Sequence, residues 1–488
     1  MAGEQYSGVR ESIPCRINDL GTTGKDAENN FRKGCLKAAD RSFAQGLQCQ
    51  QINSMAALMS LEDSVFISHS PQGCVGCSVM SVDMYRVGQA HRGIKNIRNP
   101  KIIVTNIDQK SVVFGGEQKL RDSVKKAIDR YNPKLIFIYA SCASGIIGDD
   151  IDAISADLQK GTDSVIVPIH CEGFKSKICA SGFDAAFLAI NKHILKHEKL
   201  PKEKGLVNLF APTTISYADQ TEIERMLSLI EVKVNYIPFY SSLDKMKTIP
   251  QAEASTSICK VFADEFMKTL WEDYEIPYSH TVMPIGVHNT DKWYRGIAKV
   301  LGKEKEVEEI IAKEHERIGP LVAKLKARLQ GKRVFICGGT GRSFAAAALV
   351  DDFGMELVGL ETPTYDEDAQ EDIEYLIEIN EDFILDIANM QPFEQVNLLN
   401  KLKPDAFIGV PLWAAKLGIP TTHVLDGKRP TMGYDGLLFL GNKMADQLEN
   451  PGFNVKLSKH VKLPYKASWY EEDAFKYIEK GEQICLKY

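Results

Sequence analysis

KLIFIYA at residues 134–140 lies between two similar runs, KIIVTNI at 101–107 and SVIVPIH at 164–170. Apolar runs of this length, separated by segments long enough for a helix, are typical of parallel strands in βαβ units. The pattern recurs in LVNLFAP (206–212), VKVNYIPF (232–239), RVFICGG (333–339), MELVGL (355–360), FILDI (383–387) and AFIGVP (406–411). The sequence therefore predicts an α/β protein built from Rossmann-like domains with parallel sheets.

The length and one charged segment indicate how the domains divide. The chain has 488 residues, and at about 100 to 200 residues per domain we expect about three domains. The segment 302–332 carries charges along its whole length and predicts a long helix between the second and third groups of strands. We therefore expect an N-terminal α/β domain at 1–205, a second α/β domain at 206–320 and a third at 321–488.

Composition and charge exclude several classes of protein. Hydrophobic residues make up 44% of the chain and charged residues 25%, which excludes a disordered or fibrous protein. The 59 Lys and Arg against 65 Asp and Glu give a net charge of -6, so nucleic acid is disfavoured as a partner. No apolar run approaches the ~20 residues that span a bilayer, and the start, MAGEQYSGVRESIPC, lacks the pattern of a secretory signal. We expect no membrane association and a cytoplasmic location.

The 11 cysteines indicate metal binding or catalysis, because a reducing compartment keeps thiols from forming disulfides. Cys142, Cys171 and Cys337 follow or end predicted strands. In open α/β sheets, ligands gather at the carboxyl ends of the strands, so these thiols are expected where sites form. The alternative for each one is a small buried hydrophobe, since free cysteine is among the most buried residue types.

Cys49, Cys74 and Cys142 form the first candidate metal site. Each lies in or beside a glycine-bearing loop, whose backbone amides can approach the sulfides of an iron-sulfur cluster. Cys77 forms a CxxC pair with Cys74, which is a weak indication of a metal or redox site. Zinc is the alternative, although zinc ligands usually come as two close pairs and only one pair is present here.

Cys259 is the second candidate ligand. Its spacing from Phe262 and Phe266 predicts an amphipathic helix with the thiol in the first turn, and Ser255 to Ser257 are N-cap candidates. A thiol in the first turn feels the positive end of the helix, which favours the thiolate that binds metal. A core cysteine on an amphipathic helix is the alternative.

Several motifs occur in the order and at the spacing found in nitrogenases. They are ISHSPQGC (67–74), VFGGEQKL (113–120), CASGIIGDDI (142–151), HCEGF (170–174), IPY (276–278), FGMELVG (353–359) and YDG (434–436). Over about residues 45–445 the chain resembles the catalytic α-type subunit of the molybdenum-iron protein family of nitrogenases. The resemblance implies the nitrogenase component 1 fold, with three Rossmann-like parallel-sheet domains surrounding a buried metallocluster.

The resemblance also implies roles for the cysteines. Cys49, Cys74 and Cys142 match the ligands of half of an electron-relay 8Fe-7S P-cluster. A homologous β-type partner subunit supplies the other half, in an α2β2 heterotetramer. Cys259 matches the cysteine ligand of a catalytic 8Fe-9S-C-type cluster, whose heterometal stays open. Cys77 is an open extra.

Departures from nitrogenase occur around the catalytic cluster. In TMGYDG, Met432 stands where nitrogenases have a histidine ligand, so the second ligand is Met432, His423 or none. Counted from CEGF, Cys179 and Phe183 stand where a glutamine and a histidine face the cofactor. This change removes a proton donor and makes the pocket more apolar.

Two cations on the cofactor side match the family. Lys416 in AAKLGIP matches a lysine that contacts the organic acid of the nitrogenase cofactor, and Arg342 in GGTGRSF lies where the family places arginines beside the cluster. Both are plausible counter-charges to a polyanionic cluster. An ordinary surface lysine and an ordinary loop arginine are the alternatives.

These departures argue against dinitrogen reduction and favour a likeness to the methylthio-alkane reductases. The resemblance then implies cleavage of C–S bonds in dimethyl sulfide or 2-(methylthio)ethanol, giving methanethiol plus methane or ethylene. The chain has no GxxxxGK motif followed by Ser or Thr, so ATP hydrolysis falls to a separate 4Fe-4S reductase component. The alternatives are a non-catalytic scaffold on which a nitrogenase-type cofactor matures, and a divergent nitrogenase α subunit. Reductases of tetrapyrrole biosynthesis are disfavoured, because they do not need Cys259.

Overall fold

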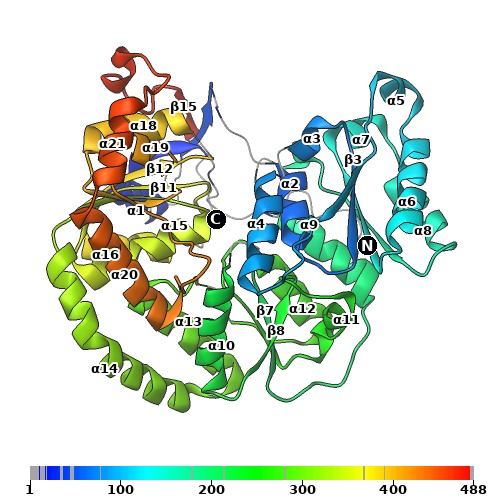
Figure 1. The fold of residues 1–488 in the computed structure, drawn as a ribbon, viewed down its shortest axis with the longest axis horizontal. Helices are drawn as coiled ribbons and strands as arrows, with labels where there is room; N and C mark the ends of the chain where they lie inside the picture. Colours follow the sequence, from blue (N-terminus) through cyan, green and yellow to red (C-terminus); the bar gives the residue numbers. More distant parts are fainter. Residues whose placement is uncertain are drawn as a thin grey trace.

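Three α/β units make up the chain in the computed structural model. It describes residues 10, 17, 19–32, 37–43, 45, 49–76, 79–176, 178, 180–212, 215–279, 282–366, 369–389, 391–410 and 412–483. Figure 1 shows the first unit on the right, the second at the bottom and the third on the left. All three are built on sheets of parallel strands, so the predicted α/β fold class is confirmed.

The first unit is a four-stranded parallel sheet in the order β4-β3-β5-β6. Its strands are β3 (Ser64–His69), β4 (Lys101–Val104), β5 (Leu135–Ala140) and β6 (Val165–Ile169). Side chains alternate across a strand, so Val65 and Ile67 pack on one face and Phe66 on the other. The first face is covered by α6 (Glu117–Tyr131) and α8 (Ile151–Gln159), the second by α2 (Gln50–Leu58) and α9 (Ser181–Ile190).

The second unit is a three-stranded parallel sheet in the order β8-β7-β9. It consists of β7 (Leu206–Phe210), β8 (Lys233–Ile237) and β9 (Ala254–Ser257). Its helices are α10 (Tyr217–Ser228), α11 (Leu243–Lys247), α12 (Asp264–Tyr274) and α13 (Gly286–Leu301). One continuous core joins residues of α10 and α13 with those of the third unit.

The third unit is a six-stranded sheet in the order β1-β12-β11-β10-β13-β14. Its parallel strands are β10 (Arg333–Cys337), β11 (Glu356–Thr362), β12 (Ile384–Ile387), β13 (Ala406–Gly409) and β14 (Thr421–Thr422). Its helices are α15 (Thr340–Ala347), α16 (Leu349–Phe353), α17 (Gln370–Ile379), α18 (Pro392–Leu402), α19 (Leu412–Lys416), α20 (Gly433–Glu449) and α21 (Gly452–His460). The strands predicted from apolar runs are all present, whereas β3 and β9 lie outside those runs.

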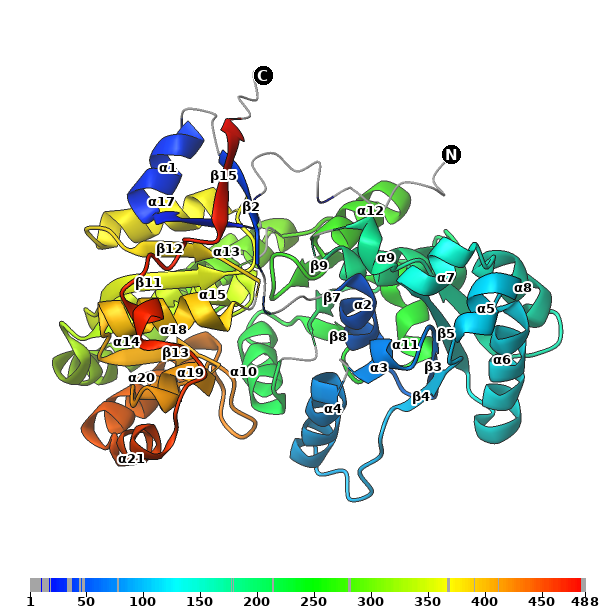
Figure 2. The ribbon, with the colours of Figure 1, turned by 90° about the horizontal axis from the view of Figure 1, so that it is seen from above.

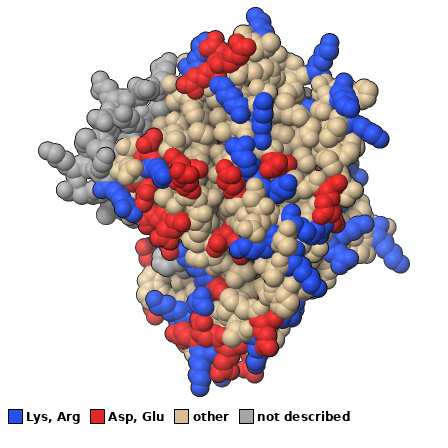
Figure 3. Space-filling view, turned by 90° about the vertical axis from the view of Figure 1, so that its left-hand side faces the viewer, with Lys and Arg blue, Asp and Glu red and all other residues tan. Residues whose placement is uncertain are grey.

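The long charged helix is confirmed as α14 (Glu304–Leu329). It buries an apolar stripe that includes Val307, Ile318 and Leu325, and its polar side chains form ion pairs such as Arg328 to Glu449 at 2.8 Å. Figure 3 shows basic and acidic side chains intermixed over one face of the molecule, as expected of a solvated surface. The boundary predicted near residue 320 falls within α14.

The N-terminal segment lies on the third unit. Strand β1 (Leu20–Thr23) pairs antiparallel with β12, and β2 (Lys37–Arg41) pairs antiparallel with β15 (Ile478–Gln483). Figures 1 and 2 both show β15 beside β2 at the edge of this unit. Residues 20–32 and 37–41, which the sequence places in the first domain, thus lie with the third unit, and the domain boundaries stay a prediction.

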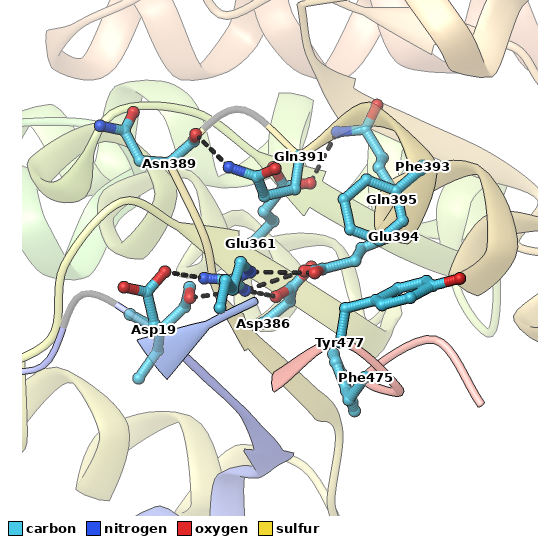
Figure 4. A network of polar contacts seen from close by, with 12 residues as sticks. Asp19, Glu361, Asp386, Asn389, Gln391, Phe393, Glu394, Gln395, Phe475 and Tyr477 are labelled. Carbon is cyan, nitrogen blue, oxygen red and sulfur yellow. Dashed lines mark hydrogen bonds and ion pairs between the residues drawn. The ribbon is translucent and has the colours of Figure 1, made fainter. Parts of the chain in front are cut away.

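Arg41 fastens this segment in place through three acidic residues, Asp19, Asp386 and Glu394, which Figure 4 shows close together. Its buried guanidinium donates to both oxygens of Glu394, at 2.9 and 2.8 Å, and forms further ion pairs with Asp386 and Asp19. Burial and the neighbouring Glu394 raise the pKa of Asp386. One cation therefore joins strands β2 and β12 with helix α18.

No helix in the described stretches combines the length and the apolar character needed to cross a membrane.

Candidate functional site

The first group of cysteines lies at the carboxyl edge of the first sheet. Cys142 opens α7 (Cys142–Ile147) directly after β5, and Ser141 caps this helix by accepting from the Ser144 amide at 3.3 Å. Cys49 stands at the N-cap position of α2, and Cys74 lies in the short helix α3 (Gly73–Gly76) that follows β3. All three thiols thus come from loops at the edge where ligands bind in open sheets.

Gly173 brings two of these cysteines to one place. A Cβ atom added at Gly173 would lie 3.3 Å from Cys49 Cβ and 3.4 Å from Cys142 Sγ, so the glycine keeps this space clear. Cys142 is exposed, and Cys49 is partly buried. Within the described residues, no three His, Cys, Asp or Glu side chains form a group that could hold a metal ion. Cys49 and Cys142 thus approach each other beside Gly173.

Buried polar contacts hold the loops of this edge. His69, the last residue of β3, contacts Asp149 through Nε2 at 2.9 Å and Thr105 through Nδ1 at 3.0 Å. Burial lowers the pKa of His69, so it is neutral near pH 7. Cys171 is fully buried and donates to the Ala140 carbonyl at 3.3 Å. Its pKa is raised by burial, which fits a structural thiol.

An exposed apolar patch surrounds Cys142. Its members are Val112, Val113, Phe114, Ile146 and Phe174, which are between 55% and 79% exposed. They come from α5 (Gln109–Phe114), which contacts α7, from α7 itself, and from the short helix η2 (Gly173–Lys175). Exposed apolar surface of this kind usually marks a site of protein–protein contact.

Cys259 lies in the turn between β9 and α12, and the prediction of a helix beginning near it is wrong. Ser255 to Ser257 belong to β9, and α12 begins only at Asp264. The apolar residues after Cys259 have a helical spacing although the first of them lie in a turn, because the turn packs its apolar side chains into the core as a helix would. The turn is fixed by Ser257 Oγ, which accepts from the Cys259 amide at 3.2 Å and donates to the Cys259 carbonyl at 3.1 Å.

The thiol of Cys259 faces the loop that opens α15. A Cβ atom at Gly341 would lie 3.3 Å from Cys259 Sγ, and Gly341 precedes Arg342. Burial raises the pKa of the Cys259 thiol, whereas the Val261 amide and the Arg342 guanidinium lower it. A bound metal would lower the pKa of this thiol and favour the thiolate, since thiols lose their proton on coordination.

Arg342 connects Cys259 to the loop that carries His423. Arg342 is 8% exposed, and its Nη1 donates to the Val424 carbonyl at 2.5 Å. The same carbonyl accepts from Thr431 Oγ1 at 3.2 Å, next to Met432. The other amino group, Nη2, has no hydrogen-bond partner within the part of the chain that the structure describes. A buried guanidinium with a spare donor fits an anionic group at this position.

His423 and Met432 differ in how well they suit a metal. Burial, with Arg342 and Lys443 nearby, lowers the pKa of His423 to about 4, so its imidazole is neutral and able to bind metal at pH 7. Met432 is fully buried in the core that joins the second and third units. The surroundings favour His423 as a ligand and Met432 as a core residue.

The remaining predicted residues are placed as follows. The ring of Phe183 in α9 lies edge-on to that of Phe262, with centroids 5.0 Å apart, in the same turn that bears Cys259. Lys416 ends α19, with its Nζ 4.3 Å from the ring centroid of Trp413. Cys179 and Cys77 lie outside the described residues. The structure thus places Arg342 near Cys259 and next to the loop that carries His423.

One buried group near Cys259 was not predicted from the sequence. Arg10 is fully buried and bridges Asp184 and Asp264, which are 174 and 254 residues away in the chain. No local pattern in the sequence around residue 10 indicates such partners, because only the fold brings them together.

The sequence matches the family described as nitrogenase component 1 type oxidoreductase over residues 49–449. It is 27% identical over 408 residues to the nitrogenase iron-molybdenum cofactor biosynthesis protein NifE of Methanococcus maripaludis, covering 82% of this chain and 81% of that protein. It is 26% identical over 411 residues to the nitrogenase molybdenum-iron protein alpha chain of Methanothermobacter marburgensis, covering 81% and 86%. The solved structure "Nitrogenase Cp1 at pH 5" superposes with a TM-score of 0.71 at 22% identity, covering 91% of this chain and 98% of that one, which supports the fold.

Proposed function

The chain belongs to the nitrogenase component 1 type oxidoreductases, and on this premise we propose that it is the catalytic subunit of a reductase that cleaves the C–S bonds of small methylthio-alkanes. Dimethyl sulfide, two electrons and two protons give methanethiol and methane. 2-(Methylthio)ethanol, two electrons and two protons give methanethiol, ethylene and water. Both reactions need a strong reductant and a pocket that accepts a small apolar molecule.

The observation that carries the proposal is the group formed by Cys259, Arg342 and His423 beside the ring of Phe183. A cluster of the 8Fe-9S-C type would supply low-potential electrons when bound. In the proposed site Cys259 holds the cluster through its thiolate, Arg342 offsets its negative charge through the spare Nη2, and His423 is the second ligand. The proposal does not specify the heterometal or the organic acid of the cluster. If an organic acid is present, Lys416 is the second cation and would bind it.

Aromatic rings packed beside the Cys259 turn support an apolar substrate. Phe183 and Phe262 meet edge-on, and Phe187 adds a third ring 5.2 Å from Phe262. Aromatic surface excludes water and favours a thioether over polar competitors. Cys179, four residues before Phe183 in the sequence, lies outside the described residues, and its place on the substrate face stays a prediction from the sequence.

Electrons would reach this site through a relay cluster held by Cys49, Cys74 and Cys142. In this proposal the cluster is an 8Fe-7S P-cluster shared with a homologous β-type subunit in an α2β2 assembly. The exposed position of Cys142 and the exposed apolar patch around it support coverage by another subunit. A separate ATP-hydrolysing 4Fe-4S component would supply the electrons.

A scaffold for cofactor maturation is the second candidate function. It is supported by the similarity to proteins named nitrogenase iron-molybdenum cofactor biosynthesis protein NifE, which match this chain as well as the nitrogenase alpha chains do. A scaffold keeps the cluster-binding cysteines and has no need of a substrate pocket. It would release its cluster to an acceptor protein instead of turning over a thioether.

The test is an anaerobic assay of the whole complex with its reductase, ATP and a reductant. Dimethyl sulfide and 2-(methylthio)ethanol are added separately, and methane, ethylene, methanethiol and iron per chain are measured. The enzyme proposal requires hydrocarbon and methanethiol in equal amounts, and their loss in Cys259→Ala. Cys337→Ala, which removes a thiol outside both candidate sites, is the matched control and should stay active. Full iron content without turnover, together with transfer of the cluster to an empty acceptor, would establish the scaffold instead.

A further inference from the structure

Arg10 forms a buried double ion pair beside the candidate catalytic site. Its Nε and Nη2 donate to the two oxygens of Asp184, at 2.5 and 2.7 Å. Nη2 and Nη1 also donate to Asp264, at 2.7 and 3.3 Å. The side chains of Arg10 and Asp184 are 0% and 1% exposed, and that of Asp264 is 18% exposed. This is the bidentate geometry in which a guanidinium binds carboxylates most firmly.

The two carboxylates belong to the helices that frame the site. Asp184 lies in the first turn of α9, directly after Phe183, and Asp264 is the first residue of α12, which follows the turn bearing Cys259. Both acids stand at helix N-termini, where negative charge is favoured. A single guanidinium therefore ties the beginning of α9 to the beginning of α12.

The positive charge of Arg10 is already balanced by carboxylates, so it is not available to offset the negative charge of a bound cluster. Two carboxylates surround its one positive charge, and both amino groups and Nε are occupied by them. Arg342 differs in this respect, because its Nη2 is without a partner in the described part of the chain. The contribution of Arg10 must then be to geometry instead of to the charge of the site.

We infer that Arg10 is a positioning residue that sets the distance between the ring of Phe183 and the turn of Cys259, and thereby the size of thioether that the pocket accepts. The inference rests on the proposed function for the identity of the substrate, but the geometric part stands without it. Phe183 at the start of α9 contacts Phe262 of the Cys259 turn, and Arg10 joins α9 to α12 beside this contact. Loosening the ion pair would let α9 move away from the turn and widen the proposed pocket.

The test compares Arg10→Lys with Arg41→Lys. A lysine keeps the positive charge but cannot bind two carboxylates in bidentate fashion. Arg41 is the matched control, because it is also a buried arginine of the N-terminal segment with several acidic partners, yet it contacts β12 and α18 instead of α9 and α12. Asp184→Asn is the second variant and breaks the same bridge from the other side.

The measurements are iron per chain, KM and kcat for dimethyl sulfide and for 2-(methylthio)ethanol, and amide hydrogen exchange of residues 183–187. In Arg10→Lys and Asp184→Asn we expect full iron, a KM for the smaller substrate raised by about tenfold or more, a smaller change for the larger substrate, and faster exchange at the start of α9. Arg41→Lys should match the wild type in all of these. An unchanged ratio of the two KM values, or an equal change in Arg41→Lys, would overturn the inference.

The failure of the proposed function would be visible separately. If the wild type turns over neither substrate, the proposed function fails, and the exchange rates alone decide the inference. Equal exchange of residues 183–187 in Arg10→Lys, Asp184→Asn and Arg41→Lys would then refute it. If Arg10→Lys does not fold, the same comparison is made with Asp184→Asn.

Discussion

The carboxyl group of Glu361 provides a test of how burial controls charge in the third unit. Glu361 is 4% exposed, and its Oε2 accepts from Gln395 Nε2 at 2.7 Å. Burial raises the pKa of Glu361 to about 7, and the nearby Glu394 adds to the effect. Figure 4 shows Glu361 beside Asp386 and Glu394, in the network of polar contacts that holds the N-terminal segment on the third unit. Glu361→Gln keeps the shape of the side chain and its acceptor for Gln395, and removes the charge.

The magnitude follows from the shift in pKa. The ordinary value is 4.5 and the folded value about 7, so the folded state binds this proton more tightly than the unfolded state does. The stability that Glu361 contributes is therefore fully present below about pH 4.5 and is lost as the pH rises through 7. At about 1.4 kcal/mol per pKa unit, the loss is about 3 kcal/mol, and less if Asp386 takes over part of the titration.

We expect the free energy of unfolding of Glu361→Gln, relative to the wild type, to rise by about 2 to 3 kcal/mol between pH 5 and pH 8. Urea unfolding of the chain without clusters, followed by tryptophan fluorescence, measures this difference. Trp469 reports on the region, because its Nε1 donates to the Phe393 carbonyl at 2.8 Å beside Glu394. Glu356→Gln, at a more exposed carboxylate of the same strand, is the control and should follow the wild type. Parallel pH profiles of Glu361→Gln and the wild type would refute the reasoning.

Three further substitutions test the candidate sites. Cys259→Ala should remove about half of the iron of the complex and all turnover while the relay cluster keeps its electron paramagnetic resonance signal, and loss of that signal as well would mean that the two sites are wrongly assigned. Gly173→Ala should disturb the relay cluster selectively, because the new methyl group lies 3.4 Å from Cys142 Sγ; an unchanged relay signal would contradict this placement. Phe183→His should not create ammonia formation, since one proton donor cannot rebuild a dinitrogen site, and ammonia from dinitrogen would favour a divergent nitrogenase.

The parallel sheets could be predicted because a central strand is buried on both faces, so its sequence is an uninterrupted run of apolar residues. Of the strands that were missed, β3 reads SVFISH and does carry a buried apolar run, whereas the edge strands β1 and β2 do not. Strand β1 reads LGTT and β2 reads KAADR, and both pair at an edge with strands far away in the sequence. Edge pairing of this kind depends on backbone hydrogen bonds and leaves little mark on side-chain choice.

The candidate site could be predicted only in part. The cysteines could be predicted because their motifs are local, whereas the position of Gly173 between Cys49 and Cys142 is visible only in the structure. The link from Arg342 to Thr431 runs through a backbone carbonyl at Val424, which no sequence pattern records. The sequence predicts a helix at Cys259 because Phe262 and Phe266 are four residues apart, as on one face of a helix. In the structure Phe262 lies in the turn between β9 and α12, and Phe266 lies in α12.

The pairing of β2 with β15 has a consequence for the synthesis of the chain. Arg41 faces Ile478 across this pair, so 437 residues must be made after β2 before its partner strand exists. At about 5 to 20 residues per second, β2 leaves the ribosome roughly 20 to 90 seconds before it can pair. During this time the strands of all three units are made, and the pairing of β2 with β15 becomes available last. A C-terminal truncation that removes β15 would therefore leave β2, which is made near the start of the chain, without its partner.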